Sequence, residues 1–168
     1  ASIKYFVQLV LNDAINSCGL ANNVDLQPEL GVLYCRPDIW ILRNNNGMPI
    51  GAVEVKKPDD NIMNNLHVHG KIYDYMMLIQ SNFKVTPVFG IVTTYKQWRI
   101  YWLQGSSVSA SSNNIVNNNN NNYETCDRKD RHIHGGPIIA YNNPNIMPTL
   151  LSVILKMNAS QPSQLEDN

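Results

Sequence analysis

The pattern of apolar and polar positions along the chain predicts helices and strands in a mixed order. Apolar residues recur at helical spacing over residues 3–17. β-Branched and aromatic residues with a period-two component occupy residues 32–43, and residues 49–57 resume that pattern after an Asn-Asn-Asn-Gly turn. These two stretches predict a β-hairpin that ends at Pro58.

The second half of the chain continues the mixed pattern. Residues 62–80 predict a helix, with Leu66, Gly70, Tyr73 and Met77 on one face. Strands are predicted at 87–94 and 98–103, and the first is apolar enough to be covered on both faces of a sheet. A short strand at 137–141 and a closing helix at 146–158 complete an α/β fold, a mixed sheet flanked by helices.

Residues 104–136 differ from the rest of the chain in composition. Serines, an asparagine run at 117–122 and a polar stretch after it show no helical or strand periodicity. Such a segment buries too little apolar area to offset its conformational entropy. We therefore expect one domain over residues 1–168, interrupted by a flexible low-complexity insertion at about 104–136.

The length of the apolar runs, the spacing of the cysteines and the net charge limit the location and the partners that we expect for the protein. No apolar run approaches the roughly 18 residues of a membrane span, so we expect no membrane partner. Cys18, Cys35 and Cys126 form no C-x-x-C pair, which favours a reducing, intracellular location, with the nucleus as one candidate. The chain begins without Met and is interpreted as part of a longer protein with other domains. A formal net charge of zero argues against nucleic-acid binding over the whole surface, but not against a local basic cleft.

The hairpin carries the residues best suited to chemistry. Glu54 and Lys56 are two apart on a strand and share a face. A turn centred on Asn46 would put Leu42 opposite Ile50, Trp40 opposite Ala52, and Asp38 opposite Glu54. Opposed residues have Cβ atoms about 4.5–5.5 Å apart, and two carboxylates that close repel unless a proton or a cation intervenes. Mg²⁺ suits such a pair because it takes oxygen ligands and keeps several waters.

This arrangement predicts a metal-dependent hydrolytic centre. A metal held by Asp38 and Glu54 would activate water and polarise a phosphoryl oxygen, while Lys56 orients the water or neutralises the transition state. The Val55 carbonyl is a candidate further ligand, and Glu29 or Asp13 could complete the acidic cluster. The alternative is structural: Asp38 caps a strand, and Glu54 and Lys56 form a surface ion pair.

Several motifs resemble those of a known superfamily. Pro37-Asp38 followed by Glu54-Val55-Lys56 matches the PD-(D/E)xK motif of restriction-endonuclease-like nucleases. Residues 70–76 resemble the Q-x-x-x-Y helix motif of some of these nucleases, with Lys71 at the Gln position and Tyr75 at the Tyr position. Residues 89–103 resemble the strand pair of Crinkler-type effector nuclease domains and type I restriction subunits.

The resemblance covers about residues 30–103 and implies a restriction-endonuclease-like core with a central four-stranded mixed sheet. It implies a Mg²⁺- or Mn²⁺-dependent nuclease acting on nucleic acid, most simply DNA. Asp38, Glu54 and Lys56 would be catalytic, and Lys71 and Tyr75 would bind the nucleic acid. Lys57, one of the basic residues in the middle of the chain, is a further candidate for nucleic-acid binding. Lys71 departs from the motif but can contact a phosphate as a point charge. The alternative is a nuclease-fold module without turnover that binds nucleic acid or partner proteins.

Histidine pairs and aromatic residues leave further alternatives. His67 and His69, and also His132 and His134, could suggest zinc, but their spacing and positions favour solvated histidines. Trp98, Tyr101 and Trp102 could stack on bases, although a dense apolar strand favours the hydrophobic core.

Overall fold

The computed structural model describes residues 2–59, 61–103 and 133–162. Most of the expected insertion at 104–136 lies outside these residues, and so does Cys126. The helices are α1 (Ile3–Ser17), α2 (Leu66–Phe83) and α3 (Ile146–Ala159), with a 3₁₀ turn at Ile62–Asn64. The strands are β1 (Val24–Pro28), β2 (Ile39–Arg43), β3 (Met48–Val55), β4 (Val85–Thr86), β5 (Val88–Thr93), β6 (Gln97–Leu103), β7 (Ile133–Gly135), β8 (Ile139–Ala140) and β9 (Gln161–Pro162).

The main sheet is mixed and has seven strands, in the order β1-β2-β3-β5-β6-β7, with β8 also paired to β6. Only the β3–β5 pair within it is parallel. The predicted four strands correspond to β2, β3, β5 and β6, so the predicted strand number is wrong. β1 was missed because Asp25, Gln27 and Pro28 interrupt its apolar pattern, and β7 falls inside the expected insertion.

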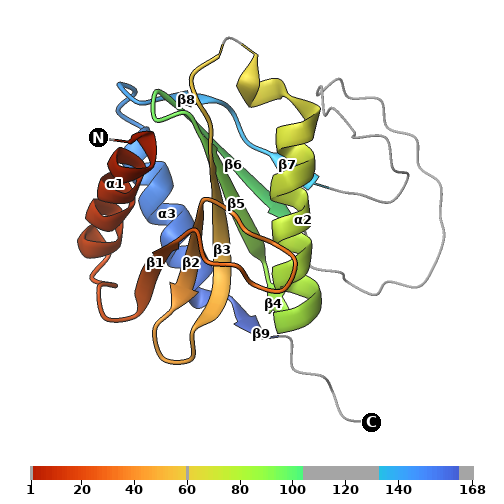
Figure 1. Ribbon diagram of the computed structural model, residues 1–168. Coiled ribbons are helices and arrows are strands. Elements are labelled where there is room, and N and C mark those ends of the chain that lie inside the picture. The colour runs from red at the N-terminus through yellow and green to blue at the C-terminus, as the bar shows by residue number, and fades with distance from the viewer. Residues whose placement is uncertain (1, 60, 104–132, 163–168) are drawn as a thin grey trace, which may run out of the picture.

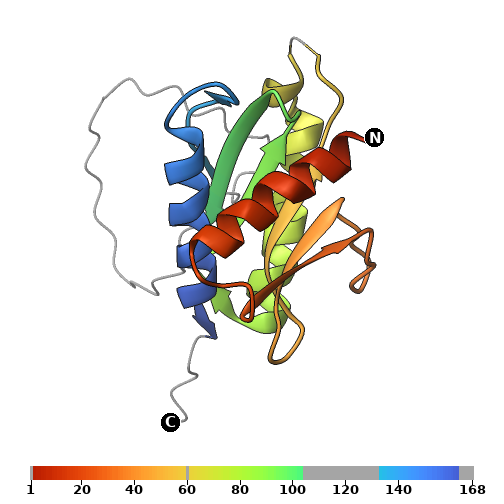
Figure 2. The same ribbon diagram turned by 90° about the vertical axis from the view of Figure 1, so that its left-hand side faces the viewer.

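The sheet is covered on both faces (Figures 1 and 2). Helices α1 and α3 pack against each other and cover one face, while α2 covers the other. This arrangement explains why every residue of β5 is buried, as the apolar pattern of that strand predicted. Among the described residues, no helix is both long and apolar enough to cross a bilayer.

Helix α2 begins at a well-defined cap. The Asn65 side chain accepts hydrogen bonds from the backbone N–H of His67 at 2.9 Å and of Val68 at 3.4 Å. The helix buries a stripe that includes Val68, Ile72, Tyr75, Met76 and Ile79. Its buried face is therefore not the predicted one, and Leu66 is 53% exposed.

The close approach of α2 to the sheet depends on a glycine. A Cβ atom on Gly90 of β5 would lie 2.5 Å from Ile72 Cγ1 and 3.2 Å from Met76 Sδ. The absence of a side chain at this position lets the helix settle directly onto the strand. Gly90 pairs with Ala52 of β3, so this close approach of α2 lies two residues from Glu54.

Candidate active site

The two predicted acidic residues lie at the same end of the β2–β3 hairpin. Ile39 pairs with Val53 and Trp40 with Ala52, which makes Asp38 and Glu54 the next residues in register. The Asp38 carboxylate also accepts a hydrogen bond of 2.7 Å from the backbone N–H of Val55. The hairpin thus brings Asp38 beside Glu54.

One detail of the predicted register is wrong. Leu42 pairs with Pro49 rather than with Ile50, because the register shifts between Ile41 and Leu42. This irregularity lies between Trp40 and the turn, so it leaves the pairing of Trp40 with Ala52 intact. The far end of the hairpin, where Asp38 lies, keeps its predicted alignment.

Glu54 is a buried acid surrounded by cations. The residue is 3% exposed, on the sheet face that α2 covers. Its Oε1 atom forms an ion pair with Lys56 Nζ and lies 3.5 Å from Lys71 Nζ. Buried carboxylates need such compensation, because removing a charge from water is costly unless a counter-charge or hydrogen bonds replace the water.

Asp38 belongs to a second set of ion pairs, with Lys4 at its centre. Lys4 Nζ lies 2.9 Å from Asp38 Oδ1 and 2.6 Å from Glu29 Oε1. The hydrogen bond to Glu29, followed by that to Asp38, raises the pKa of Lys4. The same Lys4 contact lowers the pKa of the Glu29 carboxyl. Glu29, predicted as a further metal ligand, therefore already has a cationic partner, and Arg36 is 3.8 Å from its other oxygen.

Helix α2 brings Lys71 and Tyr75 to the cluster, one turn apart. Tyr75 is buried, and its hydroxyl donates to the Arg36 carbonyl at 3.4 Å. Burial raises the pKa of Tyr75, and the charge of Glu54 raises it further. Tyr75 also packs against Trp40, with ring centroids 6.0 Å apart. The two residues that resembled the helix motif thus lie beside Glu54.

Of the remaining predicted residues, Val55 and Lys57 lie close to Glu54 in the chain, and Asp13 lies far from the cluster. Val55 is half-buried at the end of β3, next to Glu54, and Lys57 is exposed two residues further on. Asp13 is exposed on α1, nine residues beyond Lys4 and therefore about 13 Å further along the helix axis. Asp13 does not belong to the cluster.

Lys4 and Arg36 were not among the residues predicted for the site. Arg36 directly precedes the Pro37-Asp38 motif, and its neighbourhood could have been noticed from that position. Lys4 had no comparable signal, since the position of α1 on the sheet depends on packing between segments far apart in the chain. Lys4 lies 25 residues from Glu29 in sequence, yet the two side chains form a hydrogen bond.

The donor set is compatible with a magnesium ion that keeps most of its waters. Mg²⁺ in proteins is commonly held by one or two carboxylates together with waters and substrate phosphates, and Asp38 and Glu54 provide two. Within the described residues, no group of three or more His, Cys, Asp or Glu side chains is arranged to hold a metal. A richer, all-protein metal cage is therefore not formed by this part of the chain.

His69, Trp98 and Tyr101 serve packing, whereas His67 is exposed, as expected. His69 is buried against Tyr101, with ring centroids 5.3 Å apart, and its Nε2 atom is 2.9 Å from the Met63 carbonyl. It is therefore not the solvated histidine that was expected. Trp98 and Tyr101 are buried in the core, as their strand context favoured. His132 lies outside the described residues.

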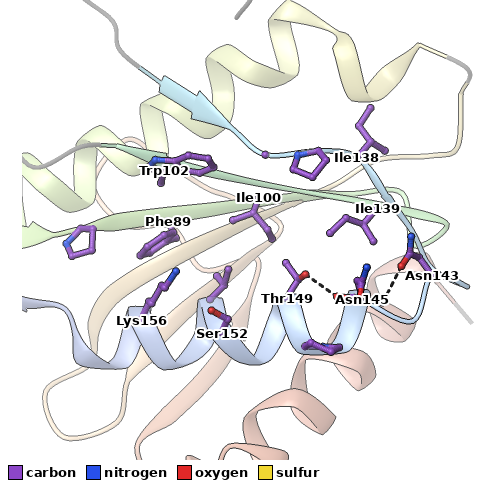
Figure 3. A pocket seen from close by; sticks show the side chains of 15 residues that line it. Phe89, Ile100, Trp102, Ile138, Ile139, Asn143, Asn145, Thr149, Ser152 and Lys156 are labelled. Atoms are coloured by element: carbon purple, nitrogen blue, oxygen red, sulfur yellow. Dashed lines mark hydrogen bonds between the residues drawn. The ribbon is translucent and has the colours of Figure 1, made fainter. Parts of the chain in front are cut away.

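A cavity lies on the other face of the sheet, beside α3. It measures about 1050 Å³ and lies between α3, β5, β6 and the segment that leads into β8. In Figure 3, Thr149, Ser152 and Lys156 of α3 face Phe89, Ile100 and Trp102 of the sheet. We call it the α3 groove. The described residues that line it include Lys156 but no carboxylate, so the groove lacks the acidic pair found on the α2 face.

Comparison with known proteins gives one structural neighbour. No protein-family model matches the chain, and no curated protein sequence matches it. Part of a solved structure, the type IIG restriction endonuclease BpuSI, is similar, with a TM-score of 0.50 and 17% sequence identity. The match covers 58% of this chain and 11% of that protein. At this identity the likeness concerns the fold of the matched part alone.

Proposed function

We propose that the protein is a Mg²⁺-dependent nuclease of the PD-(D/E)xK type that hydrolyses phosphodiester bonds in DNA. The observation that carries the proposal is the placement of Asp38 beside Glu54 at one end of a hairpin, with Lys56 next to them. The likeness in fold to part of a restriction endonuclease supports it.

Each residue of the cluster has a chemical task in this proposal. Asp38 and Glu54, with the Val55 carbonyl as a further candidate, would hold the ion. Bound there, Mg²⁺ or Mn²⁺ would supply Lewis-acid activation of water and of the phosphoryl group. During hydrolysis a P–O bond to the water oxygen forms while the P–O bond to the leaving sugar oxygen breaks, and a proton lost by the water is balanced by one that the leaving sugar oxygen gains. Lys56 neutralises the charge that builds up on the phosphoryl oxygens.

The basic residues around the acids would hold the substrate. Lys71 is 42% exposed at its side chain while remaining 3.5 Å from Glu54, so its ammonium group can turn to a phosphate without losing contact with the cluster. Lys57 is exposed at the end of β3 and extends this basic margin. Such local contacts provide affinity without a basic surface overall, which fits a net charge of zero.

A second candidate function is binding of nucleic acid or a partner protein without turnover. The ion pairs themselves favour it: Lys4 engages Asp38 and Glu29, while Lys56 and Lys71 engage Glu54. A fold that has lost its metal would need this kind of internal compensation to keep a buried acid.

Incubation with supercoiled plasmid DNA separates the two functions. We expect wild-type protein to nick the plasmid in Mg²⁺ or Mn²⁺ and not in EDTA, and Asp38→Asn to abolish nicking while the thermal midpoint stays close to that of wild type. DNA binding without nicking in any divalent metal would favour the second function. Equal nicking by Asp38→Asn would locate the activity elsewhere.

A further inference from the structure

Residues 29–36, which form most of the loop between β1 and β2, are tied together by several hydrogen bonds. Val32 and Cys35 exchange two backbone hydrogen bonds, of 2.9 and 3.0 Å. Arg36 Nε donates to the Glu29 carbonyl at 2.8 Å, and Trp40 Nε1 donates to the Leu30 carbonyl at 2.9 Å. These contacts fix the loop as a preformed element beside Asp38.

The same loop presents large side chains to solvent at its tip. Tyr34 is 82% exposed and Leu33 is 67% exposed, the two highest values among the large hydrophobic side chains described as exposed. Leu33 has a φ of 52°, a left-handed conformation that is unfavourable for a bulky residue. Strained, well-anchored residues of this kind are concentrated at binding and active sites.

Tyr34 stands at the rim of a polar pocket next to the cluster. The pocket measures about 490 Å³, and its lining comprises Tyr34, Cys35, Arg36, Lys71, Asp74, Tyr75 and Met77. Lys71 belongs both to this pocket and to the surroundings of Glu54, since its Nζ lies 3.5 Å from Glu54 Oε1. The volume lies within the roughly 300–1000 Å³ of small-molecule sites, which suits a single nucleotide and not a duplex.

We propose that this pocket binds one unpaired nucleotide of the substrate, next to the scissile phosphate. The base stacks on the exposed Tyr34 ring, and the phosphate contacts Arg36 and Lys71. Aromatic stacking tolerates any base and requires that the base has left the helix. The preferred substrate would then be single-stranded or frayed DNA.

This inference rests on the proposed function for its ligand class, and it is tested by binding without cleavage. A short fluorescently labelled DNA strand and the duplex of the same sequence are titrated with protein in EDTA, and anisotropy is followed. The variants are Tyr34→Ala, Tyr34→Phe, which keeps the aromatic ring, and Leu155→Ala. Leu155 is also an exposed hydrophobic residue, 48% exposed, but it lies on α3.

We expect wild-type protein to bind the single strand more tightly than the duplex. Tyr34→Ala should weaken single-strand binding about 5- to 100-fold, the range that loss of one stacked base produces. Tyr34→Phe and Leu155→Ala should stay within about twofold of wild type, and duplex binding should change little in any variant, because a paired base cannot enter the pocket. Because Tyr34 is exposed, the thermal midpoint should not move.

Three results would overturn the inference: no effect of Tyr34→Ala, an equal loss of single-strand and duplex binding, or wild-type protein that binds no single strand. A plasmid assay on the same wild-type protein keeps the two proposals apart. If the protein nicks the plasmid but single-strand binding does not depend on Tyr34, only the proposal of a nucleotide pocket is refuted. If single-strand binding depends on Tyr34 but the plasmid is not nicked, only the proposal of nuclease activity is refuted.

Discussion

The two faces of the sheet differ sharply in the kind of group they bury, although the same strands build both. Val53 and Glu54 are neighbours on β3, and both are buried, yet their side chains point to opposite faces. The face under α2 holds a buried carboxylate with two lysines. The face under α1 and α3 holds Phe89, Ile100 and Trp102, which line the α3 groove.

The two faces place different demands on the positions of their side chains. An apolar groove is stabilised by the area it removes from water and needs no particular atom in a particular place. A buried acid is costly unless its partners are positioned to a fraction of an ångström. The α2 face accepts that cost at Glu54, which is why we locate function there and treat the α3 groove as the control surface for the experiments.

The largest expected contrast comes from a matched pair of lysines. Lys56 belongs to the cluster, and Lys156 lines the α3 groove. Lys56→Gln should reduce DNA cleavage at least about 100-fold, the usual loss when one transition-state-stabilising donor is removed. Glutamine can still donate to Glu54, so the fold should survive. Lys156→Gln should remain within twofold of wild type, and similar losses in both variants would erase the distinction between the faces.

A matched pair of glycines sharpens the comparison in stability. At Gly90 an added Cβ would meet Ile72 of α2 at 2.5 Å, whereas at Gly51 it would meet the flexible end of Met157 of α3 at 2.6 Å. Gly90→Ala should lower the free energy of unfolding by about 1–3 kcal/mol, and Gly51→Ala by less, because the methionine terminus can move aside. Urea denaturation measures both, and a larger loss for Gly51→Ala would contradict the described packing.

Lys71 should act on binding and not on the chemical step. Lys71→Gln removes one phosphate contact, so DNA affinity should fall several-fold, and the slope of log affinity against log salt should flatten by about one unit. Turnover at saturating substrate should change little. A collapse of turnover with unchanged binding would instead assign Lys71 to the reaction itself.

The smallest effect concerns Lys4, which in the proposed site would compete with a metal ion for Asp38. Lys4→Met frees Asp38 Oδ1 and Glu29 Oε1, which Lys4 contacts at 2.9 and 2.6 Å. The Lys4–Asp38 pair is half-buried near the surface, and ion pairs near the surface are worth up to about 1 kcal/mol, so Mn²⁺ affinity should tighten by up to about fivefold. Weaker Mn²⁺ binding in this variant would mean that Lys4 supports the site instead of competing for it.

The elements with strong local patterns were predictable, and the ones that depend on distant contacts were not. Helix α1 has the predicted bounds, and Trp40 faces Ala52 as the hairpin pattern required. β1 could not be foreseen, because its pairing with β2 compensates for a weak apolar pattern of its own. Residues 32–38 were expected as strand, but they lie in the loop and the approach to β2, because Leu33 adopts a left-handed conformation there.

The grouping of the candidate-site residues was predictable to the extent that one hairpin and one helix bring them together. Asp38, Glu54 and Lys56 came from strand geometry, and Lys71 and Tyr75 from a motif resemblance. The position of Lys4 beside Asp38 and the pocket at Tyr34 depend on how α1 and the β1–β2 loop pack against the hairpin. Tertiary packing of this kind produces no periodic pattern in the sequence.

Calorimetric titration of Mn²⁺, with plasmid nicking by the same preparations, tests the central claim most directly. The samples are wild type, Glu54→Gln and Lys56→Gln. We predict that wild type binds Mn²⁺ and nicks DNA, that Glu54→Gln does neither, and that Lys56→Gln binds the metal without nicking, because lysine is not a metal ligand. Folded wild-type protein that neither binds Mn²⁺ nor cleaves DNA would contradict the assignment of Asp38, Glu54 and Lys56 as a nuclease centre.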